Sequence, residues 1–213
     1  MANHQETLMA IANFMGDQHP EVAAHFVRKH RSYLSESIRK MHDGVVAYGP
    51  FKGLRFDSSS HWGAGDKGGM ILGLYEQELL RELQVVPKKY DTFIDLGAAD
   101  GYYGVGVLVN DLFKKSYCYE ITDLGREVIT RTAKLNGVED RVVVRGEATA
   151  NLIGEIPDGE RNRSVLFVDI EGAEFNILKK EMFDGFAQSV IFVELHDWFF
   201  DDAKEKMDGL LNA

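Results

Sequence analysis

Three carboxylates follow a strongly apolar run in the second half of the chain. The run VLFV leads directly into Asp169, Glu171 and Glu174, and a second apolar run, VIFVEL, leads into His196. A carboxylate at the end of a buried strand costs free energy unless a hydrogen bond or an opposite charge compensates it. Carboxylates and histidines are also the side chains that most often act as general bases. Asp169, Glu171 and His196 are therefore the candidate catalytic residues.

Two of these groups also have a plain structural interpretation. Glu174 lies where a helix is expected to begin, and an acid in the first turn of a helix interacts favourably with the helix dipole. His196 fits a structural histidine as well as it fits a base. The pattern alone leaves the roles of Glu174 and His196 open.

A glycine-rich turn forms a second candidate site, in the stretch FIDLGAADGYYG. Small residues at a strand-to-helix turn let the backbone approach a ligand closely. The dinucleotide fingerprint G-x-G-x-x-G fails here, because Ala99 and Tyr102 stand where its second and third glycines would be. The spacing is D-x-G-x-x-x-G instead, with Asp95, Gly97 and Gly101. Such a turn suits a nucleoside ligand that lacks a pyrophosphate.

Acids also follow two further strand patterns. SYCYEI reaches Glu120 about 20 residues after the glycine turn, where ribose recognition is expected in this topology. A carboxylate there can accept both hydrogen bonds of a ribose diol, although a solvated acid at a strand end is the alternative. RVVVRGEAT places Glu147 and Ala148 after the next strand, where they could contact an adenine edge.

The elements that must position these residues alternate regularly after Pro87. The apolar runs DTFIDLG, SYCYEI, RVVVRG, SVLFVDI and SVIFVEL are separated by helical patterns. This alternation predicts right-handed βαβ units and an α/β fold with a Rossmann-like, doubly wound, mostly parallel sheet. Ligands bind beyond the carboxyl ends of the strands in such sheets, where all of these candidates fall.

Residues 1–69 are predicted to form a helical and irregular extension, and residues 70–213 the domain that holds the sheet. Helices are expected at 5–15 and 20–41. The segment GAGDKGG lacks the spacing of a phosphate loop, and we interpret it as a flexible loop or lid. The second helix should pack by one apolar face. That face comprises Val22, Phe26, Val27, Leu34, Ile38 and Met41.

Composition excludes several classes of function. The chain has 213 residues and a net charge of −10, which argues against nucleic acid as a partner because phosphate binding needs a basic face. Its single cysteine, Cys118, excludes an intramolecular disulfide and a cysteine-based zinc site. We see neither a signal peptide nor an apolar run long enough for a membrane span. We therefore expect a cytoplasmic protein with no membrane partner.

The combined motifs resemble class I S-adenosylmethionine-dependent methyltransferases, specifically the FkbM-like group. The resemblance rests on FIDLGAADGYYG, CYEI and VDIEGAEFNILKK…VIFVELHD, with GLYEQELL before the first strand, and covers about residues 70–197. It implies S-adenosyl-L-methionine as cofactor and O-methylation of a small-molecule hydroxyl, such as that of a sugar or a secondary metabolite.

The resemblance also implies roles for individual residues. Glu120 would take the ribose hydroxyls, Asp95 would orient the turn and the amino group of the ligand, and Asp169 would lie beside the sulfonium. A divalent metal ion that bridges Asp169 and Glu171 to the methyl acceptor would also allow methyl transfer. The sequence shows no third ligand for such an ion, so no metal site is predicted. The full set of expected cofactor contacts is Asp95, Gly97, Ala98, Asp100, Gly101, Tyr102, Glu120, Ile121, Glu147, Ala148 and Asp169.

One departure from the family concerns the edge of the sheet. Two further strands normally follow the fifth, whereas HDWFFDDAKEKMDGLLNA predicts one short helix. A bare edge invites coverage, either by residues 43–60 or by a second subunit. We expect a homodimer anchored by Trp198, Phe199 and Phe200, unless these aromatics pack onto their own sheet.

The sequence allows two alternative functions. A nicotinamide-dependent oxidoreductase is disfavoured by the failed dinucleotide fingerprint. A catalytically idle, methyltransferase-like module that binds the cofactor or a partner protein is the alternative from another class.

Overall fold

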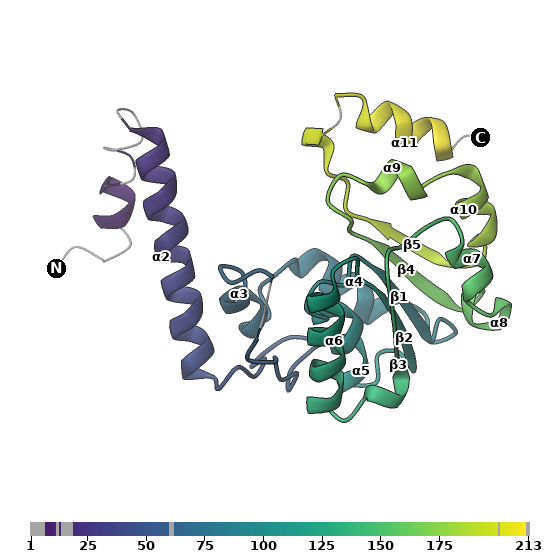
Figure 1. Ribbon diagram of the computed structural model, residues 1–213, viewed down its shortest axis with the longest axis horizontal. Helices are drawn as coiled ribbons and strands as arrows, with labels where there is room; N and C mark the ends of the chain where they lie inside the picture. The colour runs from purple at the N-terminus through teal and green to yellow at the C-terminus, as the bar shows by residue number, and fades with distance from the viewer. Residues whose placement is uncertain (1–6, 12, 14–18, 60–61, 200, 212–213) are drawn as a thin grey trace.

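A five-stranded, all-parallel sheet forms the centre of the molecule. The computed structural model describes residues 7–11, 13, 19–59, 62–199 and 201–211 (Figure 1). The strand order is β3-β2-β1-β4-β5, which confirms the predicted Rossmann-like sheet. The strands are β1 (Thr92–Leu96), β2 (Lys115–Tyr119), β3 (Val142–Arg145), β4 (Ser164–Val168) and β5 (Val190–Val193). Chain order reverses between β1 and β4, which places the expected ligand crevice there.

Helices cover both faces of the sheet, as the alternation of patterns predicts (Figure 1). Successive residues of a strand point to opposite faces, so Phe93 joins one core cluster and Ile94 the other. The first cluster receives α4 (Gln77–Val85), α5 (Tyr102–Val109) and α6 (Asp123–Leu135). The second receives α7 (Leu152–Glu155), α9 (Glu174–Ile177), α10 (Lys180–Gly185) and α11 (Ala203–Leu211). Two further helical turns, η1 (Glu139–Arg141) and α8 (Asp158–Arg161), lie in the connections before β3 and β4.

Helix α2 (Pro20–Met41) has the predicted bounds, but its packing differs from the prediction. Only its C-terminal part reaches the body, where the Oγ of Ser35 accepts a hydrogen bond of 2.8 Å from the Gly68 N–H and Ile38 packs against the core. The rest of the helix extends away from the sheet (Figure 1). Packing along the whole apolar face was therefore the wrong expectation. The exposed members of that face are Val22, Val27, Leu34 and Met41.

The segment GAGDKGG is packed in the structure and contains the start of helix α3 (Lys67–Ile71). The Nζ of Lys67 lies 3.0 Å from the Oδ2 of Asp100, and both side chains are buried. The structure shows this part packed in one position, and its interpretation as a flexible loop or lid stays a prediction. The division at 69/70 stays a prediction, and it falls inside α3. Of the helix expected at 5–15, residues 7–11 and 13 are helical and the others lie outside the described residues.

Residues 43–59 form turns and one isolated bridge between Val45 and Arg55. The Phe51 ring packs edge-on against Tyr102 of α5, with ring centroids 5.1 Å apart. The segment thus joins the core on the α5 face of the sheet. Among the helices that the structure describes, none combines the length and the apolar character that a membrane crossing requires.

Strand β5 ends the sheet, and the described residues after it form η2 (Asp197–Phe199) and α11 instead of further strands. Trp198 lies edge-on to the His196 ring, at a centroid distance of 4.9 Å, yet its side chain remains 70% exposed. Phe199 is also exposed, and Phe200 lies outside the described residues. The homodimer stays a prediction, for which two exposed aromatics beside an edge strand are suitable anchors.

We expect light scattering to give about twice the 24.0 kDa chain mass. Trp198→Asp should return the protein to a monomer, because a charge would be buried at the interface. The control is Leu135→Asp, at an exposed position of α6 on the far side of the sheet, which should leave the mass unchanged. A monomeric wild type at high protein concentration would rule out the dimer.

Candidate ligand-binding site at the strand ends

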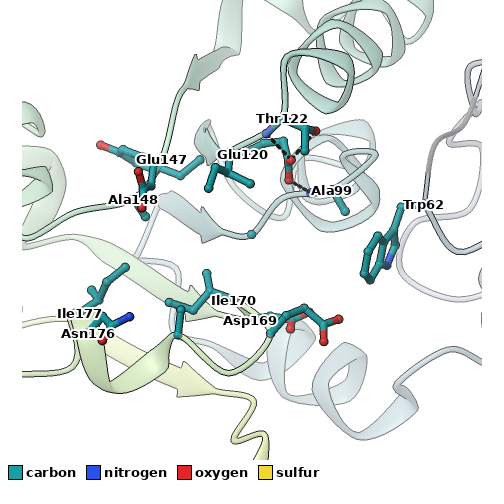
Figure 2. A pocket seen from close by; sticks show the side chains of 15 residues that line it. Trp62, Ala99, Glu120, Thr122, Glu147, Ala148, Asp169, Ile170, Asn176 and Ile177 are labelled. Carbon is teal, nitrogen blue, oxygen red and sulfur yellow. Dashed lines mark hydrogen bonds between the residues drawn. The ribbon is translucent and has the colours of Figure 1, made fainter. Parts of the chain in front are cut away.

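A pocket of about 650 Å³ opens beyond the carboxyl ends of the central strands (Figure 2). Its size falls within the range of small-molecule sites, about 300–1,000 Å³. Residues that follow β1, β2, β3 and β4 all contribute to its wall. Seven of the residues singled out from the sequence line it: Gly97, Glu120, Ile121, Glu147, Ala148, Asp169 and Glu171.

Other predicted contacts lie beside this pocket. Asp95, Ala98, Asp100 and Tyr102 line a smaller adjoining pocket, which shares Gly97 and Asp169 with the larger one. Gly101 lines neither of the two pockets. The glycine turn therefore presents only part of its length to the larger pocket.

Asp95 is buried beneath the turn and accepts a hydrogen bond from the Gly104 backbone. Burial, together with the charge of Asp169, raises the pKa of Asp95 to about 8. Its Oδ2 has no hydrogen-bond partner among the described residues, which suits a protonated carboxyl group. Asp95 thus joins the end of β1 to the first turns of α5.

Gly97 is required by the backbone itself. Its φ is +93°, and a Cβ at this position would lie 1.7 Å from the carbonyl oxygen of Asp169. The N–H groups of Gly97 and Ala98 both donate to the carbonyl of Tyr119, each at 2.9 Å. Gly97 therefore lets the ends of β1, β2 and β4 come together. The sequence argument assigned Gly97 to ligand contact and missed this requirement.

Glu120 joins the glycine turn to the start of α6. Its side chain is 7% exposed. Its Oε2 accepts a hydrogen bond of 3.1 Å from the Ala99 N–H, and its Oε1 accepts from the N–H and Oγ1 of Thr122 at 2.8 and 2.7 Å (Figure 2). A carboxylate offers about four acceptor sites, so one remains after these three bonds. Glu120 is a fixed acceptor at the pocket wall, which differs from a solvated strand-end acid.

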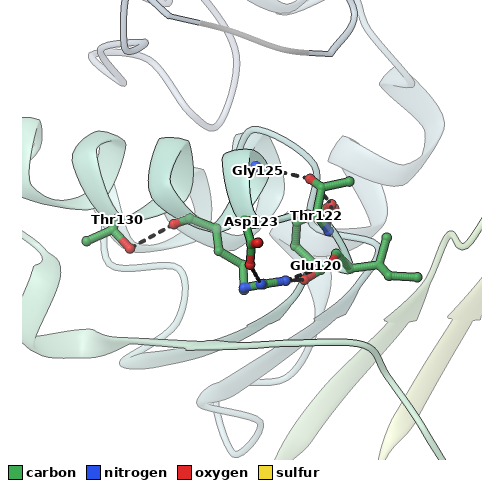
Figure 3. Close-up of polar contacts among 7 residues, drawn as sticks. Glu120, Thr122, Asp123, Gly125 and Thr130 are labelled. Carbon is green, nitrogen blue, oxygen red and sulfur yellow. Dashed lines mark hydrogen bonds and ion pairs between the residues drawn. The ribbon is translucent and has the colours of Figure 1, made fainter.

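The start of α6 holds Glu120 in place (Figure 3). Thr122 is the N-cap, and its Oγ1 accepts a hydrogen bond of 3.1 Å from the Gly125 N–H. A Cβ at Gly125 would lie 2.6 Å from the Cγ of Glu120. Sequence reasoning missed both residues, although a threonine followed by an acid and a glycine after a strand is a recognisable helix start.

Apolar side chains form the rest of the larger pocket. Ile121 follows β2. Ala148 follows β3, while Ile170 and Ile177 come from the segment after β4 (Figure 2). Such walls suit a flat aromatic group such as a nucleobase. The sequence analysis did not find the remaining lining residues, which are Trp62, Ala99, Tyr119, Thr122, Ile170, Ala173, Asn176 and Ile177.

The three predicted catalytic residues meet at the ends of β4 and β5. The Nε2 of His196 lies 3.7 Å from the Oδ1 of Asp169 and 3.5 Å from the Oε2 of Glu171. Its Nδ1 is hydrogen-bonded to the Oε1 of Glu174, a fully buried side chain. Glu174 is therefore the partner of His196, in addition to any effect on the helix dipole.

Electrostatics set the protonation of this group. Burial, followed by the charges of Glu194 and Glu76, raises the pKa of Asp169 to about 7. Burial lowers the pKa of His196, but the hydrogen bond and charge of Glu174, with the charges of Asp169 and Glu171, outweigh it and raise the pKa overall. Asp169 can thus exchange a proton near neutral pH.

Comparisons with known proteins complete the description. No protein-family model matches the chain, and no curated protein matches it either. Among solved structures, TYW2 of P. horikoshii in complex with MeSAdo is similar, with 18% identity and a TM-score of 0.33 over 42% of this chain and 31% of that chain. The tRNA methyltransferase TrmK of B. subtilis shows 15% identity and a TM-score of 0.41, over 60% of this chain and 54% of that chain.

A third similar structure is the precorrin 8W decarboxylase of Methanobacterium thermoautotrophicum. It shows 18% identity and a TM-score of 0.43, over 62% of this chain and 71% of that chain. The matches to TYW2 and TrmK span less than two thirds of those proteins. The assignment of the fold rests on the sheet order of this chain, and membership of the FkbM-like group stays a prediction.

Proposed function

We propose that this protein is an S-adenosylmethionine-dependent methyltransferase and that the larger pocket holds the cofactor. The observation that carries the proposal is Glu120, a buried carboxylate fixed against the glycine turn with an acceptor site to spare. The incomplete G-x-G-x-x-G pattern supports a nucleoside without a pyrophosphate rather than a dinucleotide.

The residues of the pocket fit each portion of this cofactor. Glu120 would accept a hydrogen bond from one ribose hydroxyl through its remaining acceptor site, and Ile121, Ala148 and Ile177 would enclose the adenine. The backbone at Gly97 would face the methionine portion. Asp169, at the end of β4, would offer a carboxylate to the positive charge of the sulfonium. Bound S-adenosylmethionine supplies an electrophilic methyl group.

The chain's own residues would prepare the methyl acceptor. Asp169, whose pKa is about 7, can remove a proton from an acceptor hydroxyl at neutral pH. His196, held by the buried Glu174, lies 3.7 Å from that carboxylate and, when protonated, would hold it through opposite charge. We therefore propose O-methylation of a small-molecule hydroxyl. The net charge of −10 supports a small molecule over a nucleic acid as the acceptor.

Cofactor binding should depend on pH through Asp169. Because the pKa of Asp169 is raised to about 7, its carboxylate becomes charged as pH rises through that value. The cationic S-adenosylmethionine should gain affinity relative to the neutral-sulfur S-adenosylhomocysteine, by up to about tenfold between about pH 6 and about pH 8. Calorimetric titration of both ligands at each pH measures the ratio of their dissociation constants. Effects of pH on the parts that the two ligands have in common cancel in this ratio.

The matched control is Asp169→Asn, in which the ratio should not change with pH. A ratio that is constant in the wild type would contradict the placement of Asp169 beside the sulfonium. A protein that binds S-adenosylhomocysteine but methylates none of a broad set of hydroxylated acceptors would instead be a cofactor-binding module.

A further inference from the structure

Asp169, Glu171 and His196 each offer a ligand atom, and these atoms all lie within 4.8 Å of one another. They come from the ends of two neighbouring strands, β4 and β5. We propose that they form a binding site for a divalent metal ion. The sequence shows two of the ligands close together, and the third becomes visible only when the sheet brings His196 beside them.

The hydrogen bonding of His196 directs one nitrogen towards the two carboxylates. Glu174 can only accept at Nδ1 when it is ionised, so neutral His196 carries its proton on Nδ1 and a lone pair on Nε2. A carboxylate that holds the far nitrogen of a histidine is the usual second layer of a metal site. This arrangement fixes the tautomer that a metal ion requires.

The Nε2 atom of His196 is buried beside two carboxylate oxygens. The His196 side chain is 3% exposed, and Nε2 makes no hydrogen bond to any residue that the structure describes. Its neighbours at 3.5 and 3.7 Å are the oxygens of Glu171 and Asp169, which are acceptors as well. Three acceptors that converge on one point repel each other unless a cation or a proton lies between them.

Hydrogen bonds and close packing hold the residues beneath this site in place. The Oε1 of Glu174 also accepts a hydrogen bond of 3.0 Å from the Gly172 N–H, so one buried oxygen holds both His196 and the turn that carries Glu171. Gly172 has a φ of +86°, and a Cβ there would lie 2.6 Å from the Phe199 ring. The ligands are thus positioned before any ion binds, which lowers the entropic cost of binding.

The negative charge around the site favours a cation that carries more than one positive charge. Glu76 and Glu194 add their negative charges to those of Asp169 and Glu171. Two carboxylates and one imidazole suit Mn²⁺ or Zn²⁺. Three protein ligands leave positions open for a further oxygen. If the proposed methyl transfer is correct, that oxygen would be the acceptor hydroxyl, whose pKa the ion would lower; ion binding itself does not depend on that function.

The test uses MnCl₂ and the full-length protein, without any cofactor. Free Mn²⁺ gives an electron paramagnetic resonance signal that decreases on binding, and we expect saturation at one ion per chain. Glu171→Gln, at a partly exposed position that should tolerate the change, should weaken binding about tenfold or more. Glu174→Gln, which changes the partner of the His196 Nδ1 and removes no metal ligand, should weaken it about 10- to 100-fold. Glu205→Gln, on the exposed side of α11, is the matched control and should bind like the wild type.

Two results would overturn the proposal. One is the absence of saturable Mn²⁺ binding, which would leave protonated His196 as the cation between the carboxylates. The other is binding that Glu171→Gln and Asp169→Asn leave unchanged. Titrating the same samples with S-adenosylhomocysteine separates this site from the proposed function, because either ligand can bind when the other does not.

Discussion

Gly97→Ala should lower the free energy of unfolding by about 2–5 kcal/mol. The left-handed backbone at φ +93° costs a non-glycine residue about 1–2 kcal/mol, and the overlap of a Cβ with the Asp169 carbonyl oxygen at 1.7 Å adds about 1–3 kcal/mol. Urea denaturation measures the difference.

Gly137→Ala provides the matched control for this variant. Gly137 also has a positive φ, +66°, but nothing lies within 4 Å of a Cβ at that position. It should therefore lose only the backbone contribution of about 1–2 kcal/mol. Equal losses in the two variants would mean that the ends of β1 and β4 are not in the close contact described here.

The expected loss of stability on substitution of Gly97 also limits how the pocket can be tested. From the sequence alone, we expect Gly97→Val to abolish cofactor binding, because the branched side chain would occupy the space of the ligand. The structure places that side chain against the Asp169 backbone, so the larger variant should unfold the protein more readily than Gly97→Ala. A loss of binding in Gly97→Val would therefore not report on the pocket alone.

Glu120→Ala should weaken S-adenosylhomocysteine binding by about 1–3 kcal/mol. The ribose hydroxyl that Glu120 binds would lose its charged acceptor, and the N–H groups of Ala99 and Thr122 would lose theirs. Calorimetry measures the change. Glu127→Ala, at an exposed position of α6, is the control and should bind with wild-type affinity.

Because Glu120 also supports the glycine turn, a second experiment isolates its contact with the ribose. The wild type should bind the 2′-deoxy analogue of S-adenosylhomocysteine more weakly than the unmodified ligand, with no change to the protein. If the two bound equally well, the assignment of Glu120 to the ribose would be wrong, even if Glu120→Ala were impaired.

Local sequence patterns could predict the sheet and the strand-end acids. Each strand is a short apolar run followed by a polar or glycine residue, and parallel strands connected by helices align those ends at one edge. Glu120 and Asp169 follow this rule directly. Their place at the pocket wall needed only the order of elements and the residue that ends each strand.

Features that depend on tertiary contacts could not be predicted in this way. His196 and Glu174 are 22 residues apart and meet only because β5 pairs with β4. The need for glycine at position 97 arises from the backbone of Asp169, which is remote in the chain. Helix α2 has an apolar face that the pattern detects, but the pattern does not show whether anything covers it.

The most direct test of the central claim is a calorimetric titration of the wild type with S-adenosylhomocysteine and, separately, with NAD. The account predicts that one S-adenosylhomocysteine binds per chain and that NAD does not bind, because the glycine turn lacks the pyrophosphate fingerprint. Saturable NAD binding, or no binding of S-adenosylhomocysteine to the folded protein, would contradict it.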